Sequence, residues 1–507
     1  MYSQLKIGAL LSYVVLALQN LVGLLYIPFM LRMMGSSEYG LYSIAVSVIA
    51  YLTILDLGFG NAIVRYTAKF RAEGKIEEQY RMFGMFFLLY CGIGLIALAI
   101  GGALCWNAEK FFGASMTTYE IGRTQIILLL MVVNLAITFP FSLFGSIITA
   151  YEKFIFLKIV MITRIILNTA TMIVLLNYGY KAVAMVVVTT IFNLLTLACN
   201  YWFCKSKLNI KLKFGKFQWG FLKEVSIYSF WIFLSTIMDC IYWNSGQFML
   251  GIFSGTAAVA IFAIAIQLQQ MYMGFSTAIY GVFLPKVTAM TATNANDQAV
   301  SNLFIKIGRI QYSVMILVLT GFFLFGRQFI HLWAGPNYDE AYIIALLLFI
   351  PLTIPYIQNM GIIILQARNQ MKFRCLLYLA ISLVCLGTQV PLAKHYGGIG
   401  CACAIAGALM LGQIIIMNIY YQKKQKLDII SFWKEIAKMS IVPILLTIIG
   451  YKTLTHYTLD SVPKLIIGIT LYLIVYLPLF FYFSMNRYER NLILQPIKKL
   501  LLIRGTK

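Results

Sequence analysis

The sequence of 507 residues is strongly apolar, because hydrophobic residues make up 61% of it and charged residues only 11%. A soluble domain is about half apolar and about a quarter charged, so this composition excludes a soluble globular protein. The formal net charge is +23, from 40 Lys and Arg against 17 Asp and Glu. In a membrane protein such an excess reflects basic cytoplasmic loops, and we therefore expect no nucleic-acid partner.

Long apolar runs recur along the chain, and many exceed the ~18 residues that indicate a bilayer span. We expect an all-α polytopic membrane protein, because a spanning helix satisfies its own backbone hydrogen bonds and the alternation of barrel strands is absent. About fourteen transmembrane helices are predicted, at residues 7–31, 41–64, 82–104, 124–149, 157–177, 181–203, 225–248, 257–283, 309–326, 341–365, 374–393, 397–421, 439–455 and 464–485.

Basic residues are distributed unevenly between alternate loops. Of the Lys and Arg residues, 31 fall in one set of loops and 8 in the other, while Arg164 lies inside a span. Because cytoplasmic loops carry the excess of Lys and Arg, both termini are predicted to be cytoplasmic. No connection is long enough for a soluble catalytic domain, so we do not expect an enzyme.

Two basic segments, residues 213–224 and 490–504, mix Lys or Arg with bulky apolar residues. This pattern is typical of interfacial helices on the anionic inner leaflet. Ordinary anchoring of the topology explains the same residues.

Cysteine and histidine give no sign of a metal site or a disulfide framework. The nine cysteines are scattered, and the only close pair is Cys401 and Cys403. The three histidines, His331, His395 and His456, lie far apart in separate loops. We therefore expect no metal and no cofactor beyond coupling to a proton or sodium gradient.

The chain contains a weak internal repeat. The stretch "NYGYKAVAM" at 177–185 recurs as "HYGGIGCAC" at 395–403, and residues 30–45 resemble residues 249–265 when one insertion is allowed. Each predicted unit has six spans, so the two copies share one orientation in the membrane. Parallel repeats of this kind are a transporter architecture, with substrate bound between lobes that rock between access states.

The repeat predicts three parts of the chain. Residues 1–203 form an N-lobe of six helices, residues 204–421 a C-lobe that begins with a basic interfacial segment, and residues 422–507 two further helices with a basic cytoplasmic tail.

The stretch "LRMMGSSEYGLYSIAVSVIAYLTILDLGFGNAIVRYTAKFRAEGK" at 31–75 resembles the first two helices of bacterial oligosaccharide flippases, the Wzx-like polysaccharide biosynthesis proteins. The likeness continues at 221–233, 250–265 and 332–342. The wider superfamily includes multidrug extruders and lipid II flippases. The resemblance implies translocation of an undecaprenyl-pyrophosphate-linked oligosaccharide across the bacterial inner membrane during O-antigen, capsule or exopolysaccharide biosynthesis. It also implies a polysaccharide polymerase and export proteins as partners.

Such a substrate needs a polar path through ~30 Å of hydrocarbon, biased toward positive charge, while its polyprenyl tail stays in lipid. Asp56 lies ~13 Å and Arg164 ~10 Å from the inner side at helical rise. The two side chains either form a buried ion pair or line one cavity. Gly58 and Gly60 allow the second helix to bend or a neighbouring helix to approach.

Other polar residues inside the spans are candidates of the same kind. Asp239 is either a coupling-ion site or a polar helix contact. Gln267 and Gln270 share a helix face and either bind sugar hydroxyls or join helices. Gln358 and Asn359 follow two prolines in the tenth span, which predicts a kinked helix beside a cavity.

A cation-coupled multidrug extruder of the related fold is the alternative function. It predicts acidic residues that attract cations, whereas a lipid-pyrophosphate carrier needs a cationic path. A polymerase or glycosyltransferase is disfavoured, because the sequence has no large outer loop, no Asp-x-Asp pair and no phosphate-binding glycine loop.

Overall fold

The computed structural model describes residues 2–215, 219–292, 296–368, 370–457, 459–492 and 494. Regular structure in these residues is entirely helical. Ten helical runs among them are long and apolar enough to cross a membrane, and two of these runs, 11–72 and 371–423, each contain two predicted spans. All fourteen predicted spans fall on helical segments. The prediction of an all-α polytopic membrane protein is therefore confirmed.

The chain divides into two compact units by packing. Unit 1 comprises Met1–Ala263 and Ser382–Cys401, and unit 2 comprises Ile264–Ile381 and Ala402–Lys507. These bounds differ from those of the predicted lobes, which follow the sequence repeat. The repeat itself stays a prediction.

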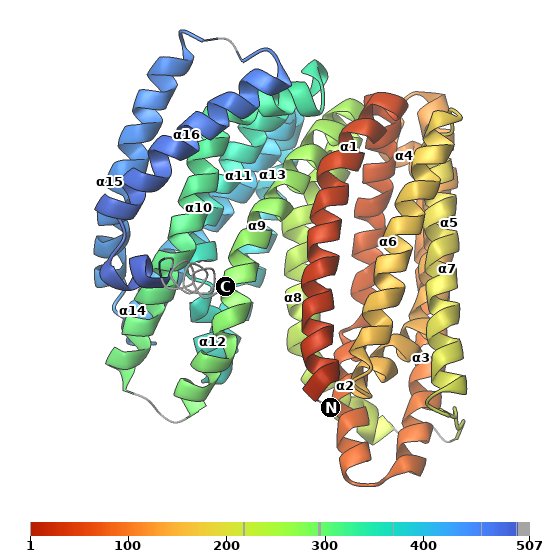
Figure 1. Cartoon of the computed structure of the whole chain (residues 1–507). Helices are drawn as coiled ribbons and strands as arrows, with labels where there is room; N and C mark the ends of the chain where they lie inside the picture. The colour runs from red at the N-terminus through yellow and green to blue at the C-terminus, as the bar shows by residue number, and fades with distance from the viewer. Residues whose placement is uncertain are drawn as a thin grey trace, which may run out of the picture. The chain divides into compact units, whose positions relative to one another are not determined.

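Unit 1 is a bundle of long helices (Figure 1). Its helices are α1 (Tyr2–Thr53), α2 (Phe59–Ala72), α3 (Ile76–Trp106), α4 (Ala108–Phe112), α5 (Thr118–Ala150), α6 (Phe154–Asn177), α7 (Ala182–Ser206), α8 (Trp219–Phe253), the start of α9 (Gly255–Ala292) and the middle of α13 (Met371–Leu409). Helix α5 packs on α3 and α7, and α1 packs on α6 and α8. Helix α1 is broken at Gly35, whose φ of 81° and ψ of 169° separate the first two predicted spans.

The loops of unit 1 lie at its two ends, as expected when successive loops alternate between the two sides of the membrane (Figure 1). At the predicted cytoplasmic end, Arg71 donates to the carbonyl of Ala150 at 3.0 Å, and the Lys213 amide donates to the carbonyl of Tyr80 at 3.1 Å. The short turn between α6 and α7 lies at the opposite end.

Residues 30–45 and residues 249–265, one pair of similar stretches in the repeat, pack directly against one another. A Cβ atom added to Gly40 would lie only 2.0 Å from the carbonyl oxygen of Thr256. Glu120 joins both stretches, because its carboxylate accepts hydrogen bonds from Ser37 at 2.6 Å and from Thr256 at 2.8 Å. Glycine at position 40 is therefore required by close backbone approach.

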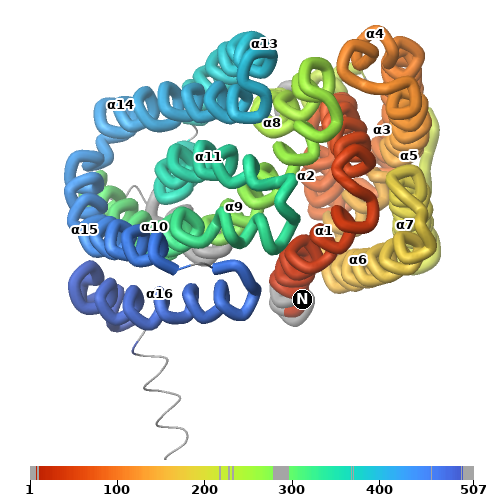
Figure 2. The backbone as a smooth tube through the Cα atoms, turned by 90° about the horizontal axis from the view of Figure 1, so that it is seen from above, coloured from red at the N-terminus to blue at the C-terminus, as the bar shows by residue number. Residues whose placement is uncertain are grey.

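Unit 2 contains the remainder of α9 and the helices that follow it. These are α10 (Asp297–Trp333), a 3₁₀ turn (Pro336–Tyr338), α11 (Glu340–Ile357), α12 (Met360–Ala367), the ends of α13 (Met371–Leu409), a π-helical turn (Met410–Ile416), α14 (Met417–Lys423), α15 (Ile429–Leu454) and α16 (Val462–Phe483). Figure 2 shows α15 beside α10 and α16 within this unit. Helix α13 is broken at Gly397, in its unit 1 part, at the first residue of the predicted span 397–421.

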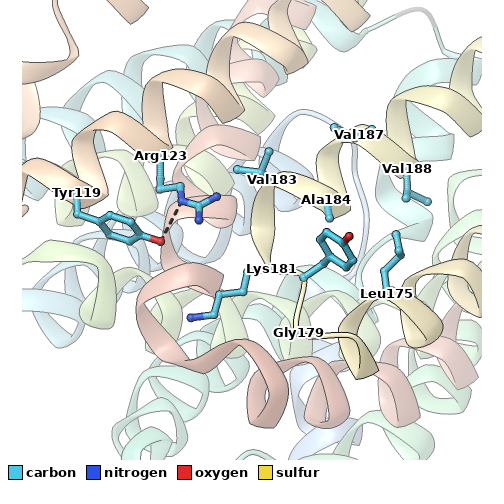
Figure 3. A pocket seen from close by; sticks show the side chains of 10 residues that line it. Tyr119, Arg123, Leu175, Gly179, Lys181, Val183, Ala184, Val187 and Val188 are labelled. Carbon is cyan, nitrogen blue, oxygen red and sulfur yellow. Dashed lines mark hydrogen bonds between the residues drawn. The ribbon is translucent and has the colours of Figure 1, made fainter.

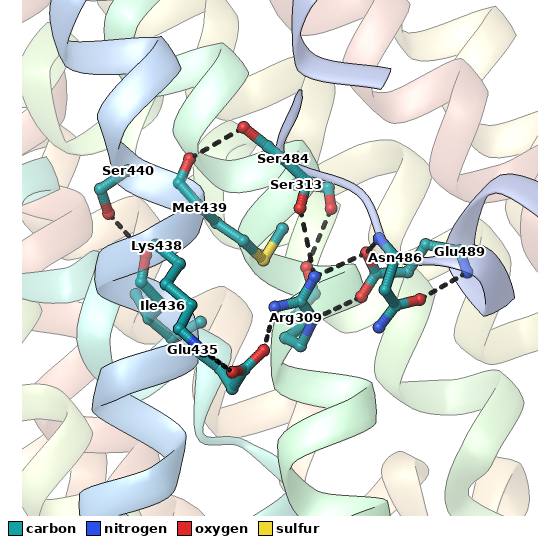
Figure 4. Close-up of polar contacts among 10 residues, drawn as sticks. All are labelled: Arg309, Ser313, Glu435, Ile436, Lys438, Met439, Ser440, Ser484, Asn486 and Glu489. Atoms are coloured by element: carbon teal, nitrogen blue, oxygen red, sulfur yellow. Dashed lines mark hydrogen bonds and ion pairs between the residues drawn. The ribbon is translucent and has the colours of Figure 1, made fainter. Parts of the chain in front are cut away.

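Within unit 2, a buried arginine of α10 binds the residues that follow α16, Ser484 and Glu489 (Figure 4). Arg309 on α10 is 5% exposed and Glu489 is 3% exposed. The guanidinium binds both carboxylate oxygens of Glu489, at 2.6 and 2.9 Å, and one oxygen of Glu435 at 2.7 Å. It also donates to the carbonyl of Ser484 at 3.2 Å. This bidentate geometry is the strongest form of an arginine–carboxylate contact.

The same Glu489 organises its own helical turn, residues 487–492. The Asn486 side chain accepts from the Glu489 amide at 2.9 Å, and the Glu489 carboxylate accepts from the Asn486 amide at 2.9 Å. The reciprocal pair satisfies two amides that a helix N-terminus leaves open.

The interfacial helix predicted over 213–224 is not a separate element. Residues 213–215 are irregular, and Lys213 forms an ion pair with Glu77 of α3. Residues 219–224 are the first turns of α8. Most of the second basic segment, 490–504, lies outside the described residues.

Candidate functional site

Asp56 lies at a break between α1 and α2. The 3₁₀ turn Ile54–Asp56 ends α1, and Leu57 and Gly58 adopt positive φ angles of 53° and 74° before α2 begins. The bend that the glycines suggested is therefore present, although the left-handed residues are Leu57 and Gly58. Asp56 consequently sits at the N-terminus of α2, where the helix dipole favours a negative charge.

The partner of Asp56 is a tyrosine. Tyr90 of α3 is completely buried, and its hydroxyl donates to the Asp56 carboxylate at 2.8 Å. The backbone amides of Gly58 and Gly60 also interact with this carboxylate. The carboxylate is thus stabilised by hydrogen bonds and a helix end.

Arg164 is half-buried on α6, and no hydrogen bond or ion pair joins it to any other side chain in the part of the chain that the structure describes. The structure does not pair it with Asp56, so the ion-pair alternative is absent from this conformation. An unpaired guanidinium inside a span is costly in hydrocarbon and marks a polar path or a ligand site.

A second helix break lies in unit 2, between α11 and α12. Pro351 and Pro355 lack the amides that would continue the hydrogen-bond ladder, and α11 ends at Ile357. Gln358 and Asn359 occupy the break itself. The kink predicted from the prolines is present.

Side chains of neighbouring helices satisfy the groups that this break releases. The Ser276 hydroxyl on α9 donates to the carbonyl of Tyr356 at 2.8 Å, and Asn359 donates to the Ser276 hydroxyl at 2.9 Å. With its amide nitrogen turned toward the break, Gln311 of α10 donates to the carbonyls of Tyr356 at 3.3 Å and Ile357 at 3.1 Å. Irregular backbone within a membrane span is tolerated where side chains supply such replacement hydrogen bonds.

Gln358 faces a different neighbour. It is 3% exposed and donates to Asn418 of α14 at 2.9 Å. Asn418 also accepts from the indole of Trp433 at 3.0 Å. Both predicted residues of the tenth span, Gln358 and Asn359, are therefore held in helix-to-helix hydrogen bonds here.

On α9, the two predicted glutamines, Gln267 and Gln270, are less buried than Gln269, which lies between them. Gln269 is 1% exposed and donates to the Tyr356 hydroxyl at 2.6 Å. Gln267 is half-buried and Gln270 is exposed. The structural polar contact on this helix is thus Gln269, which sequence reasoning missed, and the two predicted glutamines are left outside that contact.

Asp239 lies on an exposed face of α8 in unit 1, next to the buried Cys240. Six residues further along α8, Ser245 donates to Gln389 of α13 at 2.5 Å. In the part of the chain that the structure describes, no group of three His, Cys, Asp or Glu residues could hold a metal ion.

Tyr90, Ser276 and Asn418 were also missed. A usable signal existed for Asn418, which lies 218 residues after Asn200, the same offset that separates the similar stretches 177–185 and 395–403. The other two are ordinary polar residues in apolar runs, and only the neighbouring helix makes them important.

An all-α chain with ten described helical runs long and apolar enough to cross a membrane is a multi-pass membrane protein. Solved structures with a similar fold are also of membrane proteins. A structure described as the lipid II flippase MurJ in an inward closed conformation matches with a TM-score of 0.73 at 18% identity, over 96% of this chain and 100% of that one. An inward-facing multidrug resistance MATE family transporter of the MOP superfamily matches with a TM-score of 0.61 at 15% identity, over 80% and 99%.

A third structure, from Pyrococcus furiosus and titled as a MOP superfamily transporter with reverse polarity of its binding pocket, matches with a TM-score of 0.56 at 15% identity, over 83% and 96% of the two chains. At these low sequence identities, the structural matches establish the fold alone. No curated protein sequence matches the chain. The model of the polysaccharide biosynthesis protein family matches residues 6–291. The chain belongs to this family.

Proposed function

We propose that this protein is a flippase that translocates an undecaprenyl-pyrophosphate-linked oligosaccharide from the cytoplasmic to the outer leaflet of the bacterial inner membrane. The glycan would serve O-antigen, capsule or exopolysaccharide biosynthesis, with a polymerase and export proteins acting downstream. Alternating exposure of a polar path to the two sides of the membrane would move the headgroup. Membership of the polysaccharide biosynthesis family supports this proposal.

The observation that carries it is Arg164. An arginine without an acidic partner in a membrane span offers its guanidinium to a ligand, and a planar fork of donors fits the oxygens of a pyrophosphate. A neutral or cationic drug would gain nothing from this charge.

An apolar groove on unit 2 suits the lipid part of the substrate. It has a volume of about 420 Å³ and is lined almost wholly by hydrocarbon from α10, α11 and α15, including Phe323, Ile350 and Ile448. A polyprenyl chain in such a groove would stay in an apolar environment.

Asp239 is the proposed coupling site for a proton or sodium ion. The Asp239→Asn variant should weaken ion-dependent transport and leave insertion intact. Normal transport with unchanged pH and sodium dependence would remove this role.

The second candidate function is a cation-coupled multidrug extruder. Two acidic residues in spans, Asp56 and Asp239, favour it, since acids attract cationic substrates. The Tyr90 hydrogen bond that occupies the Asp56 carboxylate weighs against a drug site there.

Deletion of the gene separates the two functions. A flippase predicts lipid-linked oligosaccharide trapped facing the cytoplasm and loss of surface glycan, with dye efflux unchanged. Lost dye efflux with normal surface glycan would support the extruder and overturn the flippase.

A further inference from the structure

A pocket of about 580 Å³ opens at the end of unit 1 where α6 turns into α7 (Figure 3). Its lining comes from α5, α6, α7 and the turn between the last two: Tyr119, Arg123, Leu175, Gly179, Tyr180, Lys181, Val183, Ala184, Val187 and Val188. The loops at this end are the ones poor in Lys and Arg, so the predicted orientation places the pocket at the outer face.

The mouth of the pocket carries two cations. Arg123 uses its Nε to donate to the Tyr119 hydroxyl at 3.0 Å, which leaves its two terminal amino groups available. Lys181 begins α7 and is exposed. Neither residue forms an ion pair with an acid within the described ranges.

Two acids beside the lining residues are engaged in hydrogen bonds. Glu120, next to Tyr119, accepts from Ser37 and Thr256. Glu38 is 4% exposed and accepts from the amide of Ala182, next to Lys181, at 3.2 Å. The charged residues that line the pocket itself, Arg123 and Lys181, are both cationic.

The pocket is amphipathic along its length. Tyr119 and Tyr180 stand at the mouth with 60% and 57% of their surface exposed, as aromatic side chains do at the membrane interface. Below them, Val187 and Leu175 form an apolar wall on α7 and α6. A soluble anion would use only the mouth, whereas a lipid would fill both parts.

We propose that this pocket binds an anionic phospholipid of the outer leaflet. The terminal amino groups of Arg123 and the ammonium of Lys181 would bind the headgroup phosphate, and one acyl chain would lie along the valines of α7. Charge-assisted contacts to phosphate oxygens supply the selectivity for an anionic headgroup. The site does not depend on which substrate the protein transports.

The test uses purified full-length protein in detergent and a photoactivatable, fluorescent phosphatidylglycerol. The probe should crosslink to peptides of residues 175–188. The double variant Arg123→Gln with Lys181→Gln should bind the probe on the order of tenfold more weakly, because each basic residue near a membrane surface contributes a several-fold gain. The matched control, Lys110→Gln with Lys394→Gln, removes two other exposed outer-end cations of unit 1 and should bind normally.

Unlabelled phosphatidylglycerol should displace the probe, and neither phosphatidylcholine nor inorganic pyrophosphate should. A second variant, Ala184→Trp, fills the apolar part without changing charge and should also weaken binding. Equal loss in the control variant, or crosslinks mapped away from residues 175–188, would show diffuse attraction and overturn the proposal. Displacement by pyrophosphate together with normal binding by Ala184→Trp would show a site for a free anion, and would also overturn it.

Discussion

Arg309 and Arg164 are both arginines at or near membrane depth, and their surroundings differ completely. Arg309 is 5% exposed and uses its guanidinium for two carboxylates and a carbonyl. Arg164 is half-buried and has no such partner among the described residues. A buried charge that is paired with carboxylates holds structure together, whereas a charge without such a partner in a span is available to a ligand. The contrast separates a structural arginine in unit 2 from a functional candidate in unit 1.

The largest loss of stability is expected for Arg309→Ala. It leaves Glu489 buried without its cation, and breaking a buried pair on one side costs ~3–5 kcal/mol. Thermal unfolding in detergent and the amount of protein in the membrane would measure this. The control Lys438→Ala removes only an exposed partner of Glu435 and should cost ~0–1 kcal/mol. Equal effects of the two changes would refute a structural role specific to Arg309.

Tyr90→Phe should have a smaller effect. The change removes the hydroxyl that donates to Asp56 and leaves the carboxylate with backbone amides alone, at a cost of ~1–3 kcal/mol. Adding Asp56→Asn should recover part of this loss, because a neutral amide is cheaper to leave unpaired in a membrane. A double-mutant cycle with the same unfolding measurement checks the coupling. Additive losses would mean that the hydrogen bond contributes nothing.

Gln358→Leu should cost about as much as one buried neutral hydrogen bond, ~1 kcal/mol, since Asn418 keeps the Trp433 indole as a donor. Asn418→Leu should cost more, because it leaves both Gln358 and Trp433 without their acceptor. Thermal unfolding of the two variants gives the order, and a larger loss from Gln358→Leu would contradict it.

The smallest change in stability is expected at Arg164, where the functional effect should be the greatest. Arg164→Ala removes no hydrogen bond among the described residues, so the free energy of unfolding should change by less than ~1 kcal/mol. The protein level should therefore stay normal while transport is lost. Arg164→Lys should keep part of the activity, because lysine retains the charge but not the bidentate fork. Surface glycan normalised to membrane protein is the measurement.

The outcome at Arg164 also tests the discarded ion pair. If Arg164→Ala lowers protein level, and the double change Asp56→Asn with Arg164→Gln restores both level and surface glycan, the arginine neutralises Asp56 in another conformation. In that case the pyrophosphate role of Arg164 would be excluded.

The fold could be predicted from sequence to a large extent, because the apolar runs report membrane spans directly. The break in the tenth span was also predictable, since Pro351 and Pro355 remove amides wherever they stand. The site was harder. On α9, Gln267, Gln269 and Gln270 are chemically alike, and only the position of Tyr356 on another helix selects Gln269. Likewise, nothing within the sequence around Asp56 indicates that Tyr90 supplies its hydrogen bond.

The contact between Gly40 and Thr256 has a consequence for reading related sequences. The stretch around Gly40 carries much of the family likeness, and its small residue is demanded by a backbone carbonyl that leaves no room for a methyl group. This part of the signature therefore identifies the scaffold and says nothing about the cargo. Under the proposed function, differences in glycan preference between relatives should be sought at positions such as Gln267 and Gln270, which lie outside the helix-to-helix hydrogen bond of Gln269.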